Sequence, residues 1–230
     1  MTFEMEICDV DTRYSFTAQF LIGAAMFARQ ARDIEDNIVE SKTEEQRANN
    51  RACVVSAIMQ SAASIESEIS EILMYGPGHH LGSNGTDSES LEFLSPLSDV
   101  LEYQSTLDKY LLLLHLLRKE SFQRGKEPYQ SAALLIRLRN ELVHYKSMWG
   151  KELKKRKLIK QLKGMRFRDN PLCPDNVNFF PHKFLSSSCA SWAVETAVTF
   201  IDAVHDRLNI KSPLEAYADR LSIPEIIKEQ

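Results

Sequence analysis

The chain has 230 residues, 43% of them hydrophobic and 26% charged, with only eight glycines and eight prolines. This length suffices for a sizeable hydrophobic core, and so little glycine and proline disfavours a loop-rich β architecture. The net charge of −4 argues against a nucleic-acid binder when it is taken alone. The four cysteines lie far apart, without the spacing of a zinc site or the density of a disulfide scaffold, so we expect reduced thiols, no metal and no cofactor.

The distribution of charge along the chain is uneven. Residues 151–169 carry nine lysines and arginines against two acidic residues, a balance of +7, so the remainder of the chain sums to −11. No apolar run reaches the roughly 18 residues that a membrane span needs, and the N-terminal segment is acidic, unlike a basic export leader. We therefore expect a cytoplasmic protein with no membrane partner, in which one basic segment accompanies an acidic body.

The first half of the chain shows helical periodicity. Small and apolar residues recur along 14–40, which predicts a first helix. A second helix is expected to open at Ser41, because serine followed three residues later by Glu44 matches a capping box, and to end near residue 75. A glycine- and serine-rich loop follows. The apolar stripe of the second helix comprises Val54, Ile58, Ala62, Ile65, Ile69 and Ile72.

The second half continues the helical pattern. A leucine-rich third helix is predicted over about 96–119, and its broad apolar face favours burial against several helices. A fourth begins at about Pro128 and includes the sequence RLRNELVHY. After the basic segment and a proline-punctuated loop, a helix over about 187–208 and a short terminal helix are expected. No strand pattern persists, so we predict an all-α helical bundle with antiparallel neighbours.

One segment near the end of the fourth helix carries residues suited to phosphodiester chemistry. The guanidinium of Arg139 can hold a phosphate through paired hydrogen bonds, and the imidazole of His144 can transfer a proton near neutral pH. A base that activates a ribose 2′-hydroxyl against its own phosphate needs no metal if a cation stabilises the developing charge. Asn140, one turn before His144, is placed to orient the ring, and Arg137 is a competing phosphate contact.

Helical geometry constrains this site. At about 100° per residue, Asn140 lies directly below His144, whereas Arg139 is about 140° away from His144 around the axis. A straight helix therefore cannot present Arg139 and His144 on one narrow face. Either the helix ends or distorts near His144, or the groups of two copies meet across a two-fold axis. Surface or capping roles for these residues are the alternative on spacing alone.

The sequence RNELVH at 139–144 resembles the Arg-x4–6-His signature of the HEPN superfamily (higher eukaryotes and prokaryotes nucleotide-binding). In that family the residue after the arginine is frequently polar, as Asn140 is here. The run 62–69 resembles an upstream family helix that carries an acidic residue, and 190–195 resembles its closing helix. The likeness covers roughly residues 45–210.

The resemblance implies a HEPN-like bundle of four to five helices with an additional N-terminal helix. We accordingly expect an N-terminal helical appendage at 1–40 and a HEPN-like domain at 41–230 that contains the basic segment 151–168. It also implies a homodimer in which two Arg–His pairs line one cleft. Many such proteins are metal-independent endoribonucleases that act as toxins, in antiviral defence or in RNA processing.

Carried over to this sequence, the resemblance makes Arg139 and His144 catalytic and Asn140 supporting. The acidic residue of the upstream helix is assigned to Glu66, with Glu68 and Glu71 as alternatives.

The basic segment places positive charge beside the proposed cleft, where it would neutralise RNA phosphates. Phe167 is a candidate for stacking on an exposed base, and a solvated helix face is the alternative for the whole segment. The predicted substrate-binding residues are Arg137, Lys154, Lys155, Arg156, Arg166 and Arg168.

Three functions are compatible with these residues. The first is an endoribonuclease, a toxin or antiviral-defence effector, that takes RNA as substrate and has a separately encoded antitoxin or sensor protein as partner. The second is a non-catalytic HEPN-like module that binds nucleotide, RNA or a partner protein. The third is a structural helical dimer assembled through its acidic body and basic segment.

Overall fold

The computed structural model describes residues 15–38, 43–78, 94, 101, 103–146, 156–223 and 225. Across these residues the regular structure is helical and contains no strand, which confirms the predicted all-α bundle. None of the helices in this part of the chain combines the length and apolar composition needed to cross a membrane.

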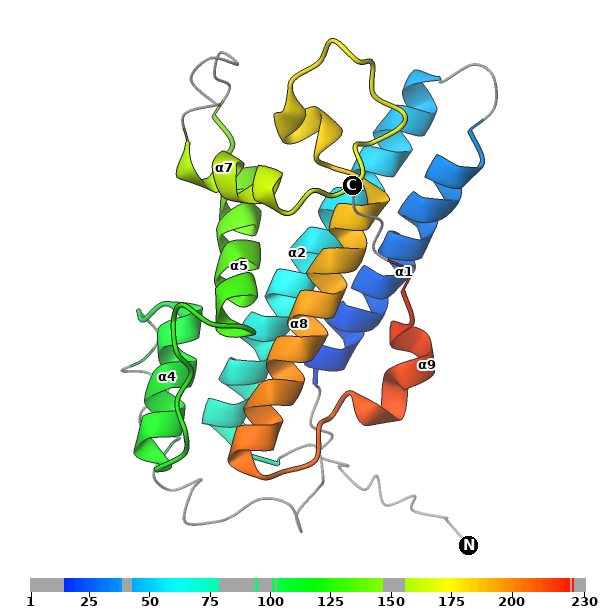
Figure 1. The fold of residues 1–230 in the computed structure, drawn as a ribbon. Helices are drawn as coiled ribbons and strands as arrows, with labels where there is room; N and C mark the ends of the chain where they lie inside the picture. The colour runs from blue at the N-terminus through cyan, green and yellow to red at the C-terminus, as the bar shows by residue number, and fades with distance from the viewer. Residues whose placement is uncertain are drawn as a thin grey trace, which may run out of the picture.

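Three long helices, α1 (Thr17–Asp36), α2 (Glu44–Tyr75) and α8 (Ser187–Leu208), lie side by side and form the centre of the bundle (Figure 1). All six predicted positions of the α2 stripe are buried. The buried face of α1 consists mainly of alanines, which allow its backbone to approach α2 closely. The first helix therefore shares one hydrophobic core with the rest of the chain.

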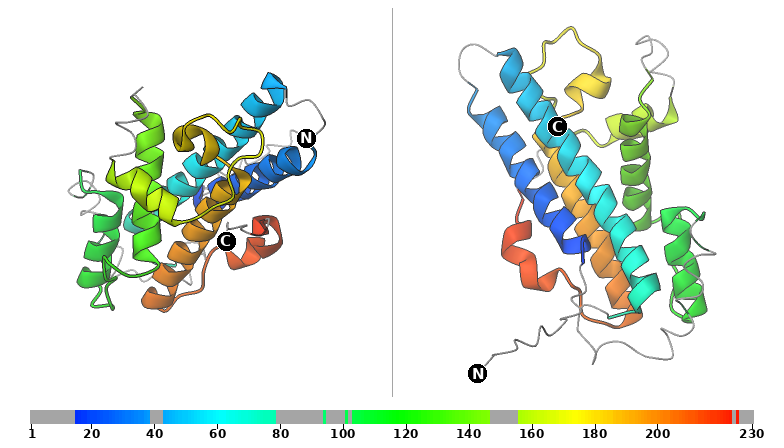
Figure 2. Two further views of the ribbon diagram at one scale, coloured as in Figure 1. Left: turned by 45° about the horizontal axis from the view of Figure 1, so that its top comes forward. Right: turned by 180° about the vertical axis from the view of Figure 1, so that it is seen from behind.

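Shorter elements flank this centre on two sides (Figure 2). The helices α4 (Thr106–Leu116), α5 (Tyr129–Val143) and α7 (Lys157–Gly164) lie on one side. The short helices η3 (Glu215–Tyr217) and α9 (Ala218–Leu221) lie on the other. α5 packs against both α2 and α8, the two longest helices, through buried residues that end at Leu138, so the candidate motif follows directly after the packed part of α5.

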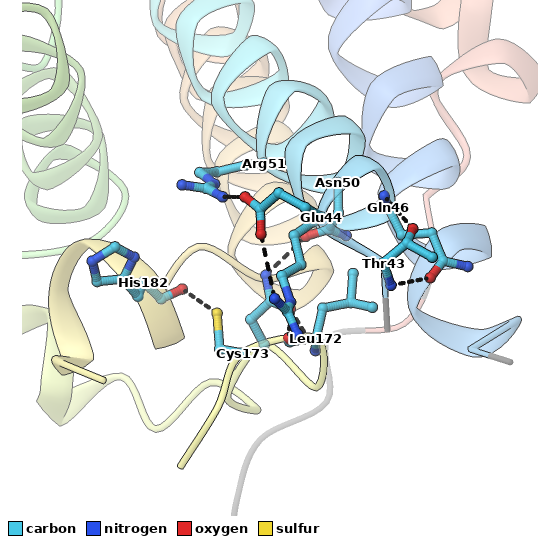
Figure 3. Close-up of polar contacts among 10 residues, drawn as sticks. Thr43, Glu44, Gln46, Asn50, Arg51, Leu172, Cys173 and His182 are labelled. Carbon is cyan, nitrogen blue, oxygen red and sulfur yellow. Dashed lines mark hydrogen bonds and ion pairs between the residues drawn. The ribbon is translucent and has the colours of Figure 1, made fainter. Parts of the chain in front are cut away.

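Two predicted helix starts are wrong. The capping box of α2 is formed by Thr43 and Gln46, whose backbone N–H groups and side-chain oxygens bond reciprocally at 3.1 Å (Figure 3). Ser41 lies outside the described residues. α4 begins at Thr106 with Ser105 as its cap, because the Ser105 hydroxyl accepts the Asp108 N–H at 3.3 Å. Most of 96–102 is outside the described residues, and 103–104 form a turn.

Two buried carboxylates cap the N-termini of neighbouring helices. Glu71 of α2 accepts the N–H groups of Phe16 and Thr17 at 2.9 and 3.3 Å. Glu35 of α1 accepts the N–H and the hydroxyl of Ser187, both at 2.6 Å, at the start of α8. Because the first N–H groups of a helix have no partner within it, these side chains satisfy donors that would otherwise be buried without one.

A buried ion pair joins α2 to α8. His205 Nε2 lies 3.1 Å from Glu68 Oε1, and His205 Nδ1 lies 3.0 Å from the carbonyl oxygen of Ile201. Both side chains are almost completely buried. Burial alone would lower the pKa of His205. The hydrogen bond and the charge of Glu68 outweigh burial, so the pKa lies above its ordinary value of 6.5.

Candidate functional site

The fourth predicted helix ends where the candidate motif ends. His144 is the C-cap of α5, and its backbone N–H donates to the carbonyl oxygen of Asn140 at 3.0 Å. The side chains of Asn140 and His144 are exposed, and neither forms a side-chain hydrogen bond with another described residue. The helix ends at His144, as one of the two predicted arrangements requires, and the meeting of two copies across a two-fold axis stays a prediction. The imidazole is open to a ligand.

Arg139 lies one and a half turns earlier and contacts α2. Its Nη2 donates to Glu66 Oε1, and the Thr106 hydroxyl donates to the same oxygen at 3.3 Å. Burial lowers the pKa of Arg139 from its ordinary value, although a guanidinium still remains a cation at neutral pH. The Nε atom of Arg139 is buried and has no hydrogen-bond partner among the described residues. The structure thus brings together Arg139 and Glu66 from two different helices.

The two alternative acidic residues serve other contacts. Glu68 pairs with His205 on α8, and Glu71 caps α1. Of the three carboxylates considered from the sequence, Glu66 is the one that contacts Arg139. Helical spacing explains this difference, because Glu68 lies about 200° around the axis from Glu66 and so faces the core.

Arg139 and His144 are not brought into contact within one copy. Arg139 is half-buried against α2, whereas His144 is exposed beyond the last turn of α5. No hydrogen bond joins the two side chains in the described structure. Within one copy, the Arg139 side chain is directed to Glu66 of α2 and not to His144.

The helical part of the basic segment is anchored to α5. Arg137 donates to Gln161 of α7, and Arg156, just before α7, donates to Glu141 of α5. Two of the predicted substrate-binding arginines therefore hold α7 in place beside the candidate motif. The exposed cations of α7 are Lys157, Lys160 and Lys163. Lys154 and Lys155 lie outside the described residues.

The prediction that Phe167 stacks on a base is wrong. Its side chain is buried, with ring centroids 5.6 Å from Trp192 and 5.9 Å from Phe184. Of the two flanking arginines, Arg166 is exposed, and Arg168 lies 4.0 Å from Asp36. The alternation of Arg, Phe and Arg reflects a buried ring between two outward-facing cations.

The exposed aromatic residue beside the motif is Tyr145, which directly follows His144. Its ring centroid lies 6.2 Å from that of Phe180, and Val143 on the other side of His144 is also exposed. Sequence reasoning overlooked Tyr145. Its position just past the expected end of a helix could have indicated its exposure, because a side chain there is less enclosed by the core.

A small cavity of about 230 Å³ lies at the start of α2, also outside the predictions (Figure 3). Its two arginines, Arg47 and Arg51, lie 3.3 and 3.5 Å from the carboxylate oxygens of Glu44. Arg47 Nε also donates to the carbonyl oxygen of Leu172 at 3.1 Å. These cations are satisfied within the chain, so the contacts fasten the loop around Leu172 to the first turn of α2.

In the described part of the chain, no three His, Cys, Asp or Glu side chains are grouped to hold a metal ion. Comparisons of the chain with known protein families, with curated proteins and with solved structures gave no match.

Proposed function

We propose that the protein is a metal-independent endoribonuclease of HEPN type, with RNA as its substrate. The observation that carries the proposal is the exposed imidazole of His144 at the end of α5, the helix that also carries Arg139 and to which Arg137 and Arg156 tie the basic helix α7. An exposed histidine can gain or lose a proton near neutral pH, and exposed lysines attract a phosphate backbone.

In the proposed reaction, His144 removes the proton from a ribose 2′-hydroxyl, and the resulting oxygen attacks the adjacent phosphorus atom. The bond from phosphorus to the 5′-oxygen breaks, which leaves a 2′,3′-cyclic phosphate on one fragment. The 5′-oxygen of the other fragment accepts a proton from water or from the protonated His144 of a second copy. Arg139 stabilises the negative charge that develops on the phosphate oxygens.

Glu66 is the positioning residue for Arg139 in this proposal. A guanidinium has five N–H donors in a planar fork, and Glu66 engages one amino group through Nη2. The donors on Nη1 remain for a phosphate. Asn140, exposed one turn below His144, is placed to bond the imidazole or the substrate.

A homodimer supplies the geometry that one copy lacks. Arg139 contacts α2 while His144 extends from the end of α5, so an Arg139 of one copy and a His144 of the other can face one phosphate across a two-fold axis. The exposed side chains of Val143 and Tyr145 on either side of His144 give this end of α5 an apolar surface for such a contact. We extend the proposal to a toxin or antiviral-defence effector with a separately encoded antitoxin or sensor.

A second candidate function is a non-catalytic module that binds nucleotide, RNA or a partner protein through the same surface. The ion pair between Arg139 and Glu66 favours it, because Glu66 already neutralises much of the charge that a transition state would need. This candidate predicts binding without cleavage.

The test is cleavage of a fluorescently labelled single-stranded RNA by the purified protein in EDTA. We expect fragments that end in a 2′,3′-cyclic phosphate, and a rate reduced about 100-fold or more in His144→Ala and in Arg139→Ala. Arg124→Ala is the matched control, because Arg124 is an exposed arginine that pairs with Asp108 away from the motif. Unaltered cleavage by both motif variants would refute the proposal, and RNA binding without cleavage would establish the second candidate.

A further inference from the structure

A groove of about 700 Å³ lies between α8 and the C-terminal segment that contains η3 and α9. The elements η3 and α9 that border it lie on the side of the bundle opposite to α4, α5 and α7 (Figure 2). Its volume is within the range of sites that bind a sizeable ligand, and its apolar lining is what such sites share. Its apolar lining residues are Val194, Val198, Ile210, Leu214, Ala218, Leu221 and Ile223. Val194, Leu214 and Leu221 are buried in the core, whereas Val198, Ile210, Ala218 and Ile223 keep some exposed surface.

Three carboxylates follow one line of α8 along this groove. Glu195, Asp202 and Asp206 are seven and four residues apart, which places them within about 40° around the helix axis and spreads them over about 16 Å. Asp202 and Asp206, four residues apart, repel each other. The described residues that line the groove include no lysine or arginine.

Lys211, which lies between the groove residues Ile210 and Ser212, is already engaged. Lys211 Nζ lies 2.9 Å from the carboxylate of Glu215, the fourth acidic residue of the groove. Asp202 accepts a hydrogen bond from the Ser212 hydroxyl at 2.5 Å, which is a neutral donor and leaves the negative charge in place. Among the described lining residues, a partly exposed apolar surface thus lies beside an acidic stripe that no lysine or arginine of the groove pairs with.

We propose that this groove binds a basic amphipathic helix of a partner protein. The apolar face of that helix would cover the partly exposed side chains of Val198 and Ile210, and its lysines or arginines would lie against the stripe on α8. Cations three or four residues apart on a helix face are separated by about 5 to 6 Å, and those seven apart by about 10.5 Å. These separations match the spacing of Glu195, Asp202 and Asp206.

Other occupants fit the groove less well. A small monovalent cation can neutralise one carboxylate of a stripe that extends over about 16 Å. A linear polyamine can span the stripe, but it is too narrow to cover the apolar residues of the groove. The basic helix α7 of a second copy is disfavoured, because its apolar residues Ile159 and Leu162 are already buried in its own core.

The groove is independent of the proposed ribonuclease site. His144 and Arg139 belong to α5, which contacts the opposite side of the α2 and α8 pair (Figures 1 and 2). A helix bound in the groove leaves the end of α5 exposed. Binding can therefore be measured in full without any assay of RNA cleavage.

The experiment measures binding of a fluorescent 18-residue peptide of leucine, alanine and lysine, designed as an amphipathic helix with its lysines in one stripe. The control peptide has the same composition with its lysines placed around the helix. Fluorescence anisotropy with the full chain should show binding of the first peptide at least about tenfold tighter than that of the control, because only one face is complementary to the groove.

The protein variants separate the groove from general electrostatic attraction. Glu195→Lys with Asp206→Lys should weaken binding of the first peptide at least about tenfold, since two attractive contacts become repulsive. Asp33→Lys with Glu120→Lys makes the same change in net charge at exposed positions elsewhere and should leave binding within about twofold. Val198→Asp should weaken binding through the apolar surface.

Three results would overturn the proposal. Equal weakening by the two charge-reversed proteins would show attraction to net charge alone, and equal binding of the two peptides would show that the groove does not recognise an amphipathic face. Spermine that displaces the peptide at comparable concentration would assign the stripe to a polyamine. Thermal unfolding of each variant, expected near the wild-type temperature, ensures that lost binding is not lost folding.

Discussion

The polar side chains inside the central bundle and those at the end of α5 are arranged in opposite ways. Within α1, α2 and α8, Glu35, Glu71 and His205 are buried and each contacts a group on a neighbouring helix. At the end of α5, Asn140 and His144 are exposed. Because an unpaired buried polar group is costly, the first set is explained by the fold. Asn140 and His144 make no comparable contact with a neighbouring helix among the described residues, so they are the better candidates for function.

The largest expected effect tests the structural half of this comparison. Glu35→Ala removes the acceptor for the N–H and hydroxyl of Ser187 and should lower the free energy of unfolding by about 1–3 kcal/mol. Urea unfolding measures this change. Glu35→Gln retains one acceptor oxygen and should lose less, whereas an Ala variant as stable as the wild type would mean that water replaces the carboxylate. His144→Ala should leave unfolding unchanged within about 0.5 kcal/mol.

A smaller effect on stability is expected at Glu66, which joins α2 of the central bundle to Arg139 near the end of α5. Glu66→Ala should reduce RNA cleavage about tenfold by releasing Arg139, yet change the free energy of unfolding by less than about 1 kcal/mol, because the pair is partly exposed. Cleavage rates and urea unfolding give the two readouts. Glu44→Ala is the matched control, since Glu44 also pairs with arginines but far along α2. If Glu66→Ala lost stability and kept its rate, Glu66 would belong with the structural carboxylates.

The buried pair of Glu68 and His205 predicts a dependence of stability on pH. The pKa of His205 is raised in the folded chain, so the protonated imidazole stabilises the fold. That contribution is complete below the unfolded pKa of about 6.5 and is lost as pH rises through the folded pKa. Urea unfolding at pH 6 and pH 9 should show this loss.

The contribution of Glu35 to the stability of the fold also decreases as pH rises, but at a lower pH than that of His205. Burial raises the pKa of Glu35 above 4.5, although bonds from Ser187 and Asn50 oppose the shift, so its contribution fades as pH rises through the folded value. A protein with Glu68→Gln and His205→Gln should keep the part of the pH dependence near 4.5 and lose the part above 6.5. An unchanged profile in that protein would exclude the pair as its source.

The smallest expected effect concerns RNA binding by the exposed lysines of α7, which belongs to the functional side of the comparison. Lys157→Ala and Lys160→Ala should each weaken RNA binding a few fold and reduce the slope of log affinity against log salt by about 0.7 for a single strand. Binding is measured in His144→Ala, so that substrate is not consumed. Lys119→Ala, at an exposed lysine beyond α4, should change neither quantity. Equal effects of all three substitutions would mean that α7 is not a preferred RNA surface.

The sequence predicted what depends on periodicity. The burial of the α2 stripe and the extent of α8 follow from apolar residues that recur every three or four positions, and both were confirmed. The start of α4 was missed because its leucines resemble those of the preceding segment, and Ser105 was not recognised as the cap. Local pattern alone did not distinguish these positions.

What depends on tertiary contact was beyond the sequence. The pairing of Arg139 with Glu66 joins residues 73 positions apart, and a crowded acidic helix offered three choices. Phe167 looked exposed because arginines flank it, yet the ring packs on Trp192. Arg137 and Arg156 were predicted as phosphate contacts, and the sequence did not show that they also join α7 to α5. The sequence shows where the charges are, and the fold decides which of them pair within the chain.

The alanine face of α1 has a consequence for how the chain tolerates change. Ala24, Ala25, Ala28 and Ala31 are all fully buried against the neighbouring long helices. Larger side chains there would have to push the backbones apart, whereas truncating the isoleucines of α2 would leave holes. In a saturation mutagenesis screen, the buried alanines of α1 should therefore tolerate larger side chains poorly, and the buried isoleucines of α2 should tolerate smaller ones poorly. Two adjoining surfaces of one core would thus show opposite preferences for side-chain size.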